Sequence, residues 1–173
     1  MDDGAQYILD ESLARAAIRV ALPTIRAFAP AAAWGPRGAV LVIDGPGLKE
    51  AVVHEMEEVS TSGQDPAHFE AVARAKLAAL QRTGRTSGAL LIADPAGLRA
   101  DDTLFEGSAA NGSLMAAASG LKGFGDTAAA DVLLRCAQLL SRAVVERLRD
   151  GDSTFVGDGL AEARSAVLAE LAL

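Results

Sequence analysis

The first apolar positions of the chain recur at helical spacing. They follow Asp10, a residue that can cap a helix, and comprise Leu13, Ala17, Val20, Ala21 and Phe28. The spacing predicts a helix from about Asp10. Pro23 falls inside this stretch, so we expect a helix that is kinked there or ends early. Pro30 and the pair Gly35-Pro36 are expected to end the segment.

Two apolar runs come next and are typical of strands. Gly38 to Asp44 is continuously apolar and rich in β-branched residues, a pattern that favours a strand buried on both faces. After the turn Gly45-Pro46-Gly47, residues Leu48 to Val59 alternate between two faces, as a second strand does. We therefore expect an antiparallel hairpin.

A second helix is predicted from Asp65-Pro66, where an N-cap precedes proline at the first helical position. Its apolar stripe consists of Phe69, Val72, Ala73, Leu77 and Leu80. Thr83-Gly84 is a stop signal. The short apolar run Ser87 to Ala93 then predicts a third strand.

The rest of the chain predicts a hairpin and two helices. Asn111-Gly112 is a strong hairpin turn, between strands expected at Thr103 to Ala109 and Ser113 to Leu121. Asp126 is expected to cap the longest helix, which runs to about Arg149. A last amphipathic helix is expected at Leu160 to Leu173, either docked or frayed.

These elements follow the order α-β-β-α-β-β-β-α with an extra C-terminal helix. Consecutive hairpin strands separated by helices indicate an α+β fold with an antiparallel sheet. The expected organisation is one domain over residues 1–150 and a helical extension over 151–173. A chain of 173 residues can bury a sizeable core without a metal or a disulfide.

Composition narrows the expected partners and compartment. The net charge is −7 and aromatic residues make up 4% of the chain. Both facts argue against nucleic-acid binding, which relies on Lys, Arg and stacking aromatics. The start of the chain has no signal-peptide pattern, and no apolar run is long enough to span a membrane. With Cys136 as its single cysteine, the protein is expected to be cytoplasmic and not membrane-bound.

Few side chains are available for catalysis. The sequence has no G-x-S-x-G, P-loop or Rossmann glycine motif. Two histidines and one cysteine exclude a Cys/His zinc cage. Glu55, Glu57 and Glu58 are acid/base candidates by chemistry alone, so an enzyme is kept only as a third hypothesis, behind two non-catalytic ones.

The candidate ligands of a cofactor or metal are His54, Met56 and His68. His54 and Met56 share a face of the predicted strand, and both residue types bind metals. The alternative is a half-exposed strand face with charged neighbours. His68 lies in the first turn of the second helix, where the neutral, ligating imidazole is favoured. Its alternative is an ordinary exposed histidine.

Lys76 lies on or beside the apolar stripe of that helix. Its amine must reach an edge of the fold or meet an acid, and it is a candidate anchor for a ligand carboxylate. The alternative is a residue at the boundary of an amphipathic helix. The loop from Gly120 to Asp126 is expected to be a tight strand-to-helix turn, because a capping Asp126 would occupy the donors that an anion needs.

Three ordered segments resemble the GlcG/HbpS-like haem-binding family over residues of about 10–149. The first is Val42 to Asp44 with Gly47. The second is Phe69 to Ala79, which follows the pattern A-x-x-K around Lys76 and precedes Arg85-Thr86. The third is Ala116 to Gly120 with Asp126 beyond it.

The resemblance implies a profilin-like five-stranded antiparallel sheet between helices and a homo-oligomer. It implies a non-catalytic ligand-binding domain for haem or a related tetrapyrrole. Pro46-Gly47-Leu48 stands where family members often carry Gly-Gly-His, so His54 or His68 would be the axial ligand. Lys76 would anchor a carboxylate.

A second hypothesis is an interaction module without a small ligand. Roadblock-type domains have a similar order of strands and helices and dimerise through a helix and a sheet edge. In that case the long helix at 127–149 and the amphipathic C-terminal segment would form the interface.

Overall fold

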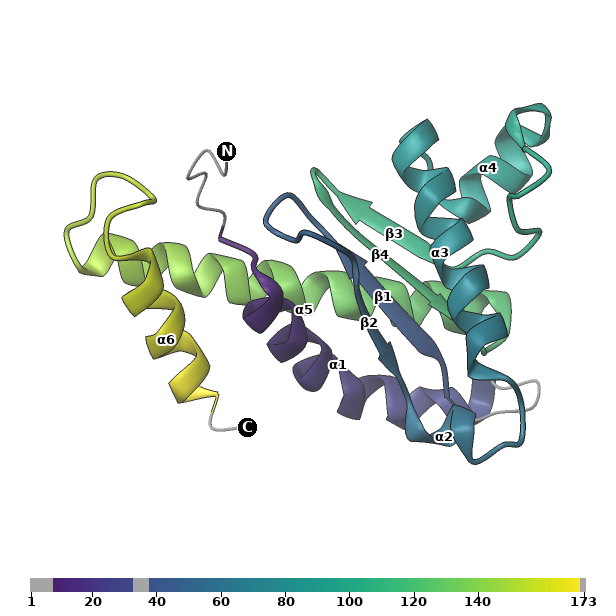
Figure 1. Ribbon diagram of the computed structural model, residues 1–173, viewed down its shortest axis with the longest axis horizontal. Helices are drawn as coiled ribbons and strands as arrows, with labels where there is room; N and C mark the ends of the chain where they lie inside the picture. The colour runs from purple at the N-terminus through teal and green to yellow at the C-terminus, as the bar shows by residue number, and fades with distance from the viewer. Residues whose placement is uncertain (1–7, 33–37, 172–173) are drawn as a thin grey trace.

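The computed structural model describes residues 8–32 and 38–171. At its centre lies a four-stranded antiparallel sheet with the strand order β2-β1-β4-β3 (Figure 1). The strands are β1 (Val40–Asp44), β2 (Val52–Glu55), β3 (Ser108–Asn111) and β4 (Leu114–Ser119). The fold is therefore α+β with an antiparallel sheet, as the sequence predicts.

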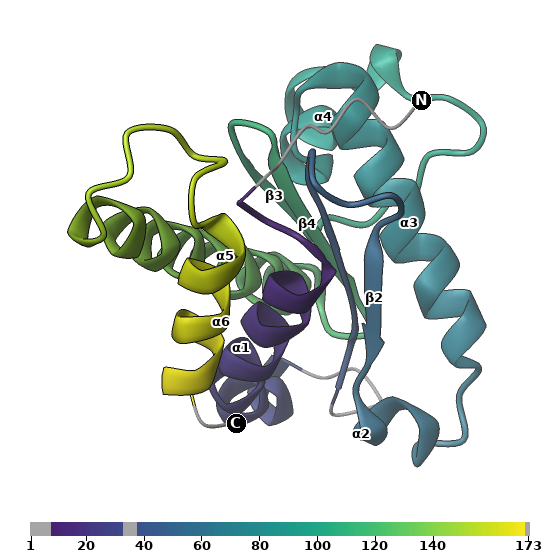
Figure 2. The same ribbon diagram turned by 60° about the vertical axis from the view of Figure 1, so that its left-hand side comes forward.

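Helices cover both faces of the sheet. α1 and α5 lie on one face and α3 on the other, while α6 packs beside α1 and α5 (Figures 1 and 2). The helices are α1 (Glu11–Ala32), α2 (Glu57–Ser60), α3 (Pro66–Thr83), α4 (Ser87–Ala93), the 3₁₀ turn η1 (Pro95–Gly97), α5 (Gly123–Asp150) and α6 (Leu160–Glu170). No helix within the described ranges is long and apolar enough to cross a membrane.

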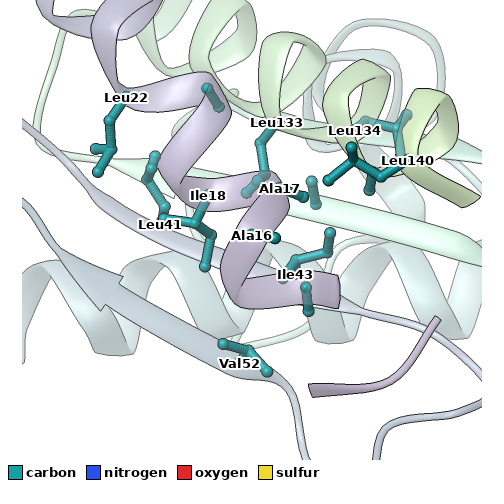
Figure 3. Close-up of a cluster of buried hydrophobic side chains, with 14 of the residues drawn as sticks. Ala16, Ala17, Ile18, Leu22, Leu41, Ile43, Val52, Leu133, Leu134 and Leu140 are labelled. Carbon is teal, nitrogen blue, oxygen red and sulfur yellow. The ribbon is translucent and has the colours of Figure 1, made fainter. Parts of the chain in front are cut away.

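The main core lies between the sheet and the pair α1 and α5. Leu41 and Ile43 of β1 point toward this pair, and Figure 3 shows them close to side chains of both helices. Small residues such as Ala16 and Ala17 are fully buried, which allows the two helices to approach each other closely. α1 continues through Pro23 and Pro30 to Ala32, so an early end at Pro23 is wrong. The predicted stop at Gly35-Pro36 lies outside the described residues.

The opposite face of the sheet has a smaller apolar cluster. Val42 of β1 and Ala117 of β4 meet Ala73 and Leu77 of α3. Alternate residues of β1 thus enter the two cores, in agreement with the prediction of a strand buried on both faces.

The described residues form four strands where the sequence and the family resemblance predict five. Ser87 to Ala93 is the helix α4 rather than a strand. Thr86 caps it by accepting a hydrogen bond from the backbone N–H of Ala89 at 3.3 Å. A seven-residue apolar run does not distinguish a strand from a buried helical turn by its periodicity. The prediction of a third strand there is wrong.

The predicted second strand is also shorter than expected. Strand pairing is confined to Val52–Glu55, and Glu57–Ser60 forms the short helix α2. The helical turn buries Val59 completely. The hairpin predicted at Asn111-Gly112 is confirmed, because Asn111 pairs with Leu114 across the turn.

Both C-terminal helices form, with one difference at the start of α5. The helix begins at Gly123 with Lys122 in the N-cap position, so the prediction that Asp126 is the cap is wrong. α6 buries Leu160, Ala163 and Val167. Arg164 forms an ion pair with Asp10 at 2.7 Å, so the last helix is docked rather than frayed.

Candidate functional site

An open cavity of about 530 Å³ lies at the end of the sheet where β4 leads into α5. α3 forms one wall, and the segment before β3 contributes an aromatic ring. The lining residues are Gln64, His68, Phe69, Val72, Phe105, Ser119, Gly120, Leu121, Gly123 and Asp126. This volume lies within the usual range for small-molecule sites, and the lining combines apolar side chains with a few polar groups.

The start of α3 positions the first set of lining residues. Asp65 accepts a hydrogen bond from the backbone N–H of Ala67 at 3.0 Å, which fixes the first turn of the helix. His68 and Phe69 follow directly. Their ring centroids lie 5.6 Å apart in an edge-to-face arrangement. Both residues border the same cavity. The Asp65 cap therefore fixes the position of the His68 imidazole in the cavity wall.

Asp126 on the inner wall of the cavity belongs to a buried ion pair. The Lys76 side chain is completely buried, and its Nζ donates to Asp126 Oδ2 at 2.8 Å and to the Ala118 carbonyl at 2.6 Å. Asp126 Oδ1 accepts from the backbone N–H of Leu121 at 2.9 Å. The pair thereby joins α3 to the turn between β4 and α5.

Gly107 leaves the space that this ion pair occupies. Its φ of +130° is a conformation that other residues rarely adopt. A Cβ at Gly107 would lie 2.5 Å from Asp126 Cβ and 2.8 Å from Lys76 Nζ. A larger residue would therefore displace the pair.

Burial shifts the pKa values of both partners toward their neutral forms. It raises the pKa of Asp126 to about 6, although the Lys76 cation and the backbone N–H groups of Leu121 and Gly120 act in the opposite direction. Burial lowers the pKa of Lys76, and the Asp126 carboxylate opposes that change. Asp126 is thus a buried carboxyl on the cavity wall that can change its charge near pH 6.

The four predicted site residues do not meet in one place. His68 borders the cavity, whereas Lys76 lies behind its wall with two partners inside the protein. His54 pairs with Leu41 across β1 and β2 and lies on the face of the sheet covered by α1. Met56 is fully buried, and its Sδ accepts a hydrogen bond from the backbone N–H of Ala39 at 3.4 Å.

This placement bears directly on metal and haem binding. His54 and His68 border different cavities on opposite faces of the sheet, so they do not form a joint ligand pair. Across residues 8–32 and 38–171, no group of three or more His, Cys, Asp or Glu side chains is arranged to hold a metal ion. Among the described residues, the 530 Å³ cavity is bordered by one imidazole, that of His68.

Two parts of the site are missing from the sequence-based prediction. Phe105 lies in a segment expected to be a strand, and its ring borders the cavity instead. The sequence predicts Asp126 as a helix cap, whereas the structure makes it the partner of Lys76. The prediction that the Lys76 amine meets an acid or reaches an edge is the signal that could have identified this pair.

Comparison with known proteins adds no further assignment. No family model, no curated protein and no solved structure matches this chain. The site is therefore described by its own residues and their contacts.

Proposed function

We propose that this protein is a non-catalytic ligand-binding domain of the GlcG/HbpS type, and that it binds haem or a related flat tetrapyrrole. The observation that carries the proposal is the 530 Å³ cavity in which His68 stands beside the aromatic rings of Phe69 and Phe105. Flat apolar ligands bind well against aromatic side chains when a polar group fixes their orientation.

The lining residues fit a haem with one protein ligand to the iron. His68 is exposed, and its imidazole supplies the nitrogen donor that haem iron binds in many proteins. When bound, haem would supply an iron centre for redox or gas-binding chemistry. Val72 and Leu121 add apolar surface that excludes water. The described lining contains no Lys or Arg, so the propionates would remain solvated.

Lys76 has a different role in this proposal from the one that the sequence suggests. Its cation is held by Asp126 and Ala118 and does not border the cavity. It acts as a positioning residue, because it holds α3 and the start of α5 at the separation that creates the cavity. A direct contact with a ligand carboxylate is not part of the proposal.

Titration with haemin, followed by the Soret band, tests this function. Wild-type protein is expected to bind one haemin per chain and to show the red-shifted band of histidine ligation. H68A is expected to lose that band. H54A is the matched control, because it removes the other histidine of the chain from a different cavity.

Two results would overturn the proposal. One is a Soret band in H68A identical to that of wild type. The other is the absence of saturable binding in the wild-type protein. Because His68 is exposed, loss of folding is not expected in H68A, and circular dichroism checks that point.

A self-associating interaction module, similar to roadblock domains, is the second candidate. Large exposed apolar side chains at one end of the molecule favour it: Ile92, Leu104, Phe105 and Phe124 are between 61% and 85% exposed. The first three border one shallow cavity. α6, by contrast, already packs its buried residues against the rest of the chain.

Light scattering during size exclusion tests this candidate. A homodimer of wild type that becomes a monomer in the variant I92K/L104K would support self-association through these side chains. A monomer in both proteins, or a dimer unaffected by the substitutions, would overturn it.

A further inference from the structure

A second cavity of about 430 Å³ lies on the other face of the sheet, between α1 and the edge strand β2. Its lining residues are Ser12, Arg15, Ile18, Arg19, His54 and Leu168. Leu168 comes from α6, so the C-terminal helix closes one side. The sheet separates this cavity from the one that contains His68.

Hydrogen-bond donors gather on one side of the second cavity. Ser12, Arg15 and Arg19 follow one another at intervals of three and four residues, so they share a face of α1. Arg15 Nε and Nη2 donate to Glu11 at 2.9 and 2.7 Å. A guanidinium has five N–H donors in a fixed plane, so this contact leaves others for a ligand.

His54 faces these donors from β2. Burial lowers the pKa of His54, and so do the nearby cations Arg26 and Arg15, whereas Glu55 and Glu58 raise it. Arg26 Nε donates to Glu58 Oε1 at 2.9 Å, and the Ser60 hydroxyl donates to Glu55, whereas Glu58 Oε2 is buried without a hydrogen-bond partner among the described residues. The described cavity lining includes Arg15, Arg19 and His54 but neither of these acids, so an anion that enters it meets two guanidinium groups and a half-buried imidazole.

We propose that this second cavity is a binding site for a small molecule with an oxyanion group, a phosphate or a carboxylate. The oxyanion is held by Arg15, Arg19 and His54. The body of the molecule packs against Ile18 and Leu168, the apolar residues of the lining. Planar guanidinium groups bind both kinds of oxyanion in a bidentate manner.

NMR spectroscopy of the full chain offers a direct test, since its two histidines serve as probe and internal control. The Cε1–H resonances of His54 and His68 are followed while inorganic phosphate, phenyl phosphate or benzoate is added. Phenyl phosphate is expected to shift the His54 resonance saturably and to raise the pKa of that imidazole. It is expected to bind more tightly than inorganic phosphate, because its ring packs on Ile18 and Leu168. The benzoate series separates carboxylate from phosphate preference.

Two arginine variants complete the test. R19Q is expected to weaken phenyl phosphate binding about tenfold, since a charged hydrogen-bond donor is lost. R74Q is the matched control, because Arg74 is also an exposed helix residue and forms an ion pair with Glu70 at 2.7 Å on the far side of the sheet. R74Q should bind like wild type.

Three outcomes would overturn the proposal. The first is a parallel, non-saturating shift of both histidines with each of the three compounds. The second is an equal loss of affinity in R19Q and R74Q. The third is that none of the compounds changes the His54 resonance.

Discussion

The two faces of the sheet are built in different ways. The face under α1 and α5 is covered by a continuous apolar core, in which Leu13, Ile25, Leu41 and Leu133 are fully or almost fully buried. The face under α3 has a small apolar cluster and the buried pair of Lys76 and Asp126. Each face borders a cavity, but within the described ranges only the face under α3 places a buried ion pair beside its cavity, whereas the face under α1 and α5 is held mainly by apolar contacts.

The difference follows from the cost of burying charge. An apolar side chain gains free energy in proportion to the area it removes from water. The attraction within a buried ion pair offsets little more than the free energy lost when both charges leave water. Removal of one partner, however, leaves the other charge buried and uncompensated. The face under α3 is therefore the more sensitive of the two to changes of charge, pH and backbone space.

The largest effect is expected when one member of the ion pair is removed. K76M should lower the free energy of unfolding by about 3–5 kcal/mol, because Asp126 loses its buried partner. Urea denaturation followed by circular dichroism measures this. The double variant K76M/D126L should be more stable than K76M, since no buried charge remains. Additive losses in the double variant would contradict this account of the pair.

Removal of a core leucine sharpens the comparison between the faces. L133A should lower the free energy of unfolding by about 3 kcal/mol, because a fully buried side chain leaves a cavity behind. Haemin titration of the folded variant should nevertheless give wild-type affinity, whereas K76M should lose affinity as well as stability. Equal loss of haemin affinity in L133A and K76M would show that both faces of the sheet affect haemin binding to the same extent.

Asp126 should make stability depend on pH in a particular direction. Its folded-state pKa of about 6 lies above the ordinary value of 3.8, so between these values the folded protein binds more protons than the unfolded chain. The contribution of Asp126 is full below pH 3.8 and is lost as the pH rises through 6. The stability of wild type relative to D126N should therefore increase by up to about 3 kcal/mol from pH 7 to pH 4. Urea denaturation at several pH values measures it, and a decrease would mean that the ion pair outweighs desolvation.

A smaller effect is expected at the glycine beside the pair. G107A should cost about 1–3 kcal/mol more than G112A. Both positions have positive φ, but a Cβ at Gly112 meets nothing within 4 Å, whereas at Gly107 it meets the pair. The φ of +130° at Gly107 also suits alanine less well than the φ of +60° at Gly112, so thermal unfolding of the two variants measures crowding and backbone strain together. Equal melting temperatures would mean that neither effect makes glycine more necessary at position 107 than at position 112.

Local patterns predict much of the fold. The strand at β1, the proline start of α3 and the turn at Asn111-Gly112 depend on neighbouring residues, and the structure contains all three. The run at 87–93 is wrongly predicted as a strand because a short, mostly apolar segment fits a strand and a short helix equally well. How many residues of β2 pair depends on the length and position of β1, and the sequence around β2 alone does not reveal this.

The candidate site was less accessible to prediction from the sequence. The position of His68 in the first turn of a helix makes it a candidate ligand, and the residue borders the cavity. Lys76 and Asp126 are 50 positions apart, and no local pattern connects them. His54 and Met56 do share one side of the sheet, but it is the side away from His68. The alternation along a strand shows which residues share a face. Which helix covers that face depends on the packing of α1 and α3, and the strand sequence does not show it.

The central claim, that the cavity under α3 holds the ligand, is tested most directly by mapping the binding site in solution. Amide resonances of ¹⁵N-labelled protein are recorded with increasing gallium(III) protoporphyrin IX, a diamagnetic analogue of haem. The proposed function predicts saturable shifts at Phe69, Gly120 and Gly123, which border the cavity with His68. Shifts confined to β2 and α1, or no saturable shift at any residue, would contradict it.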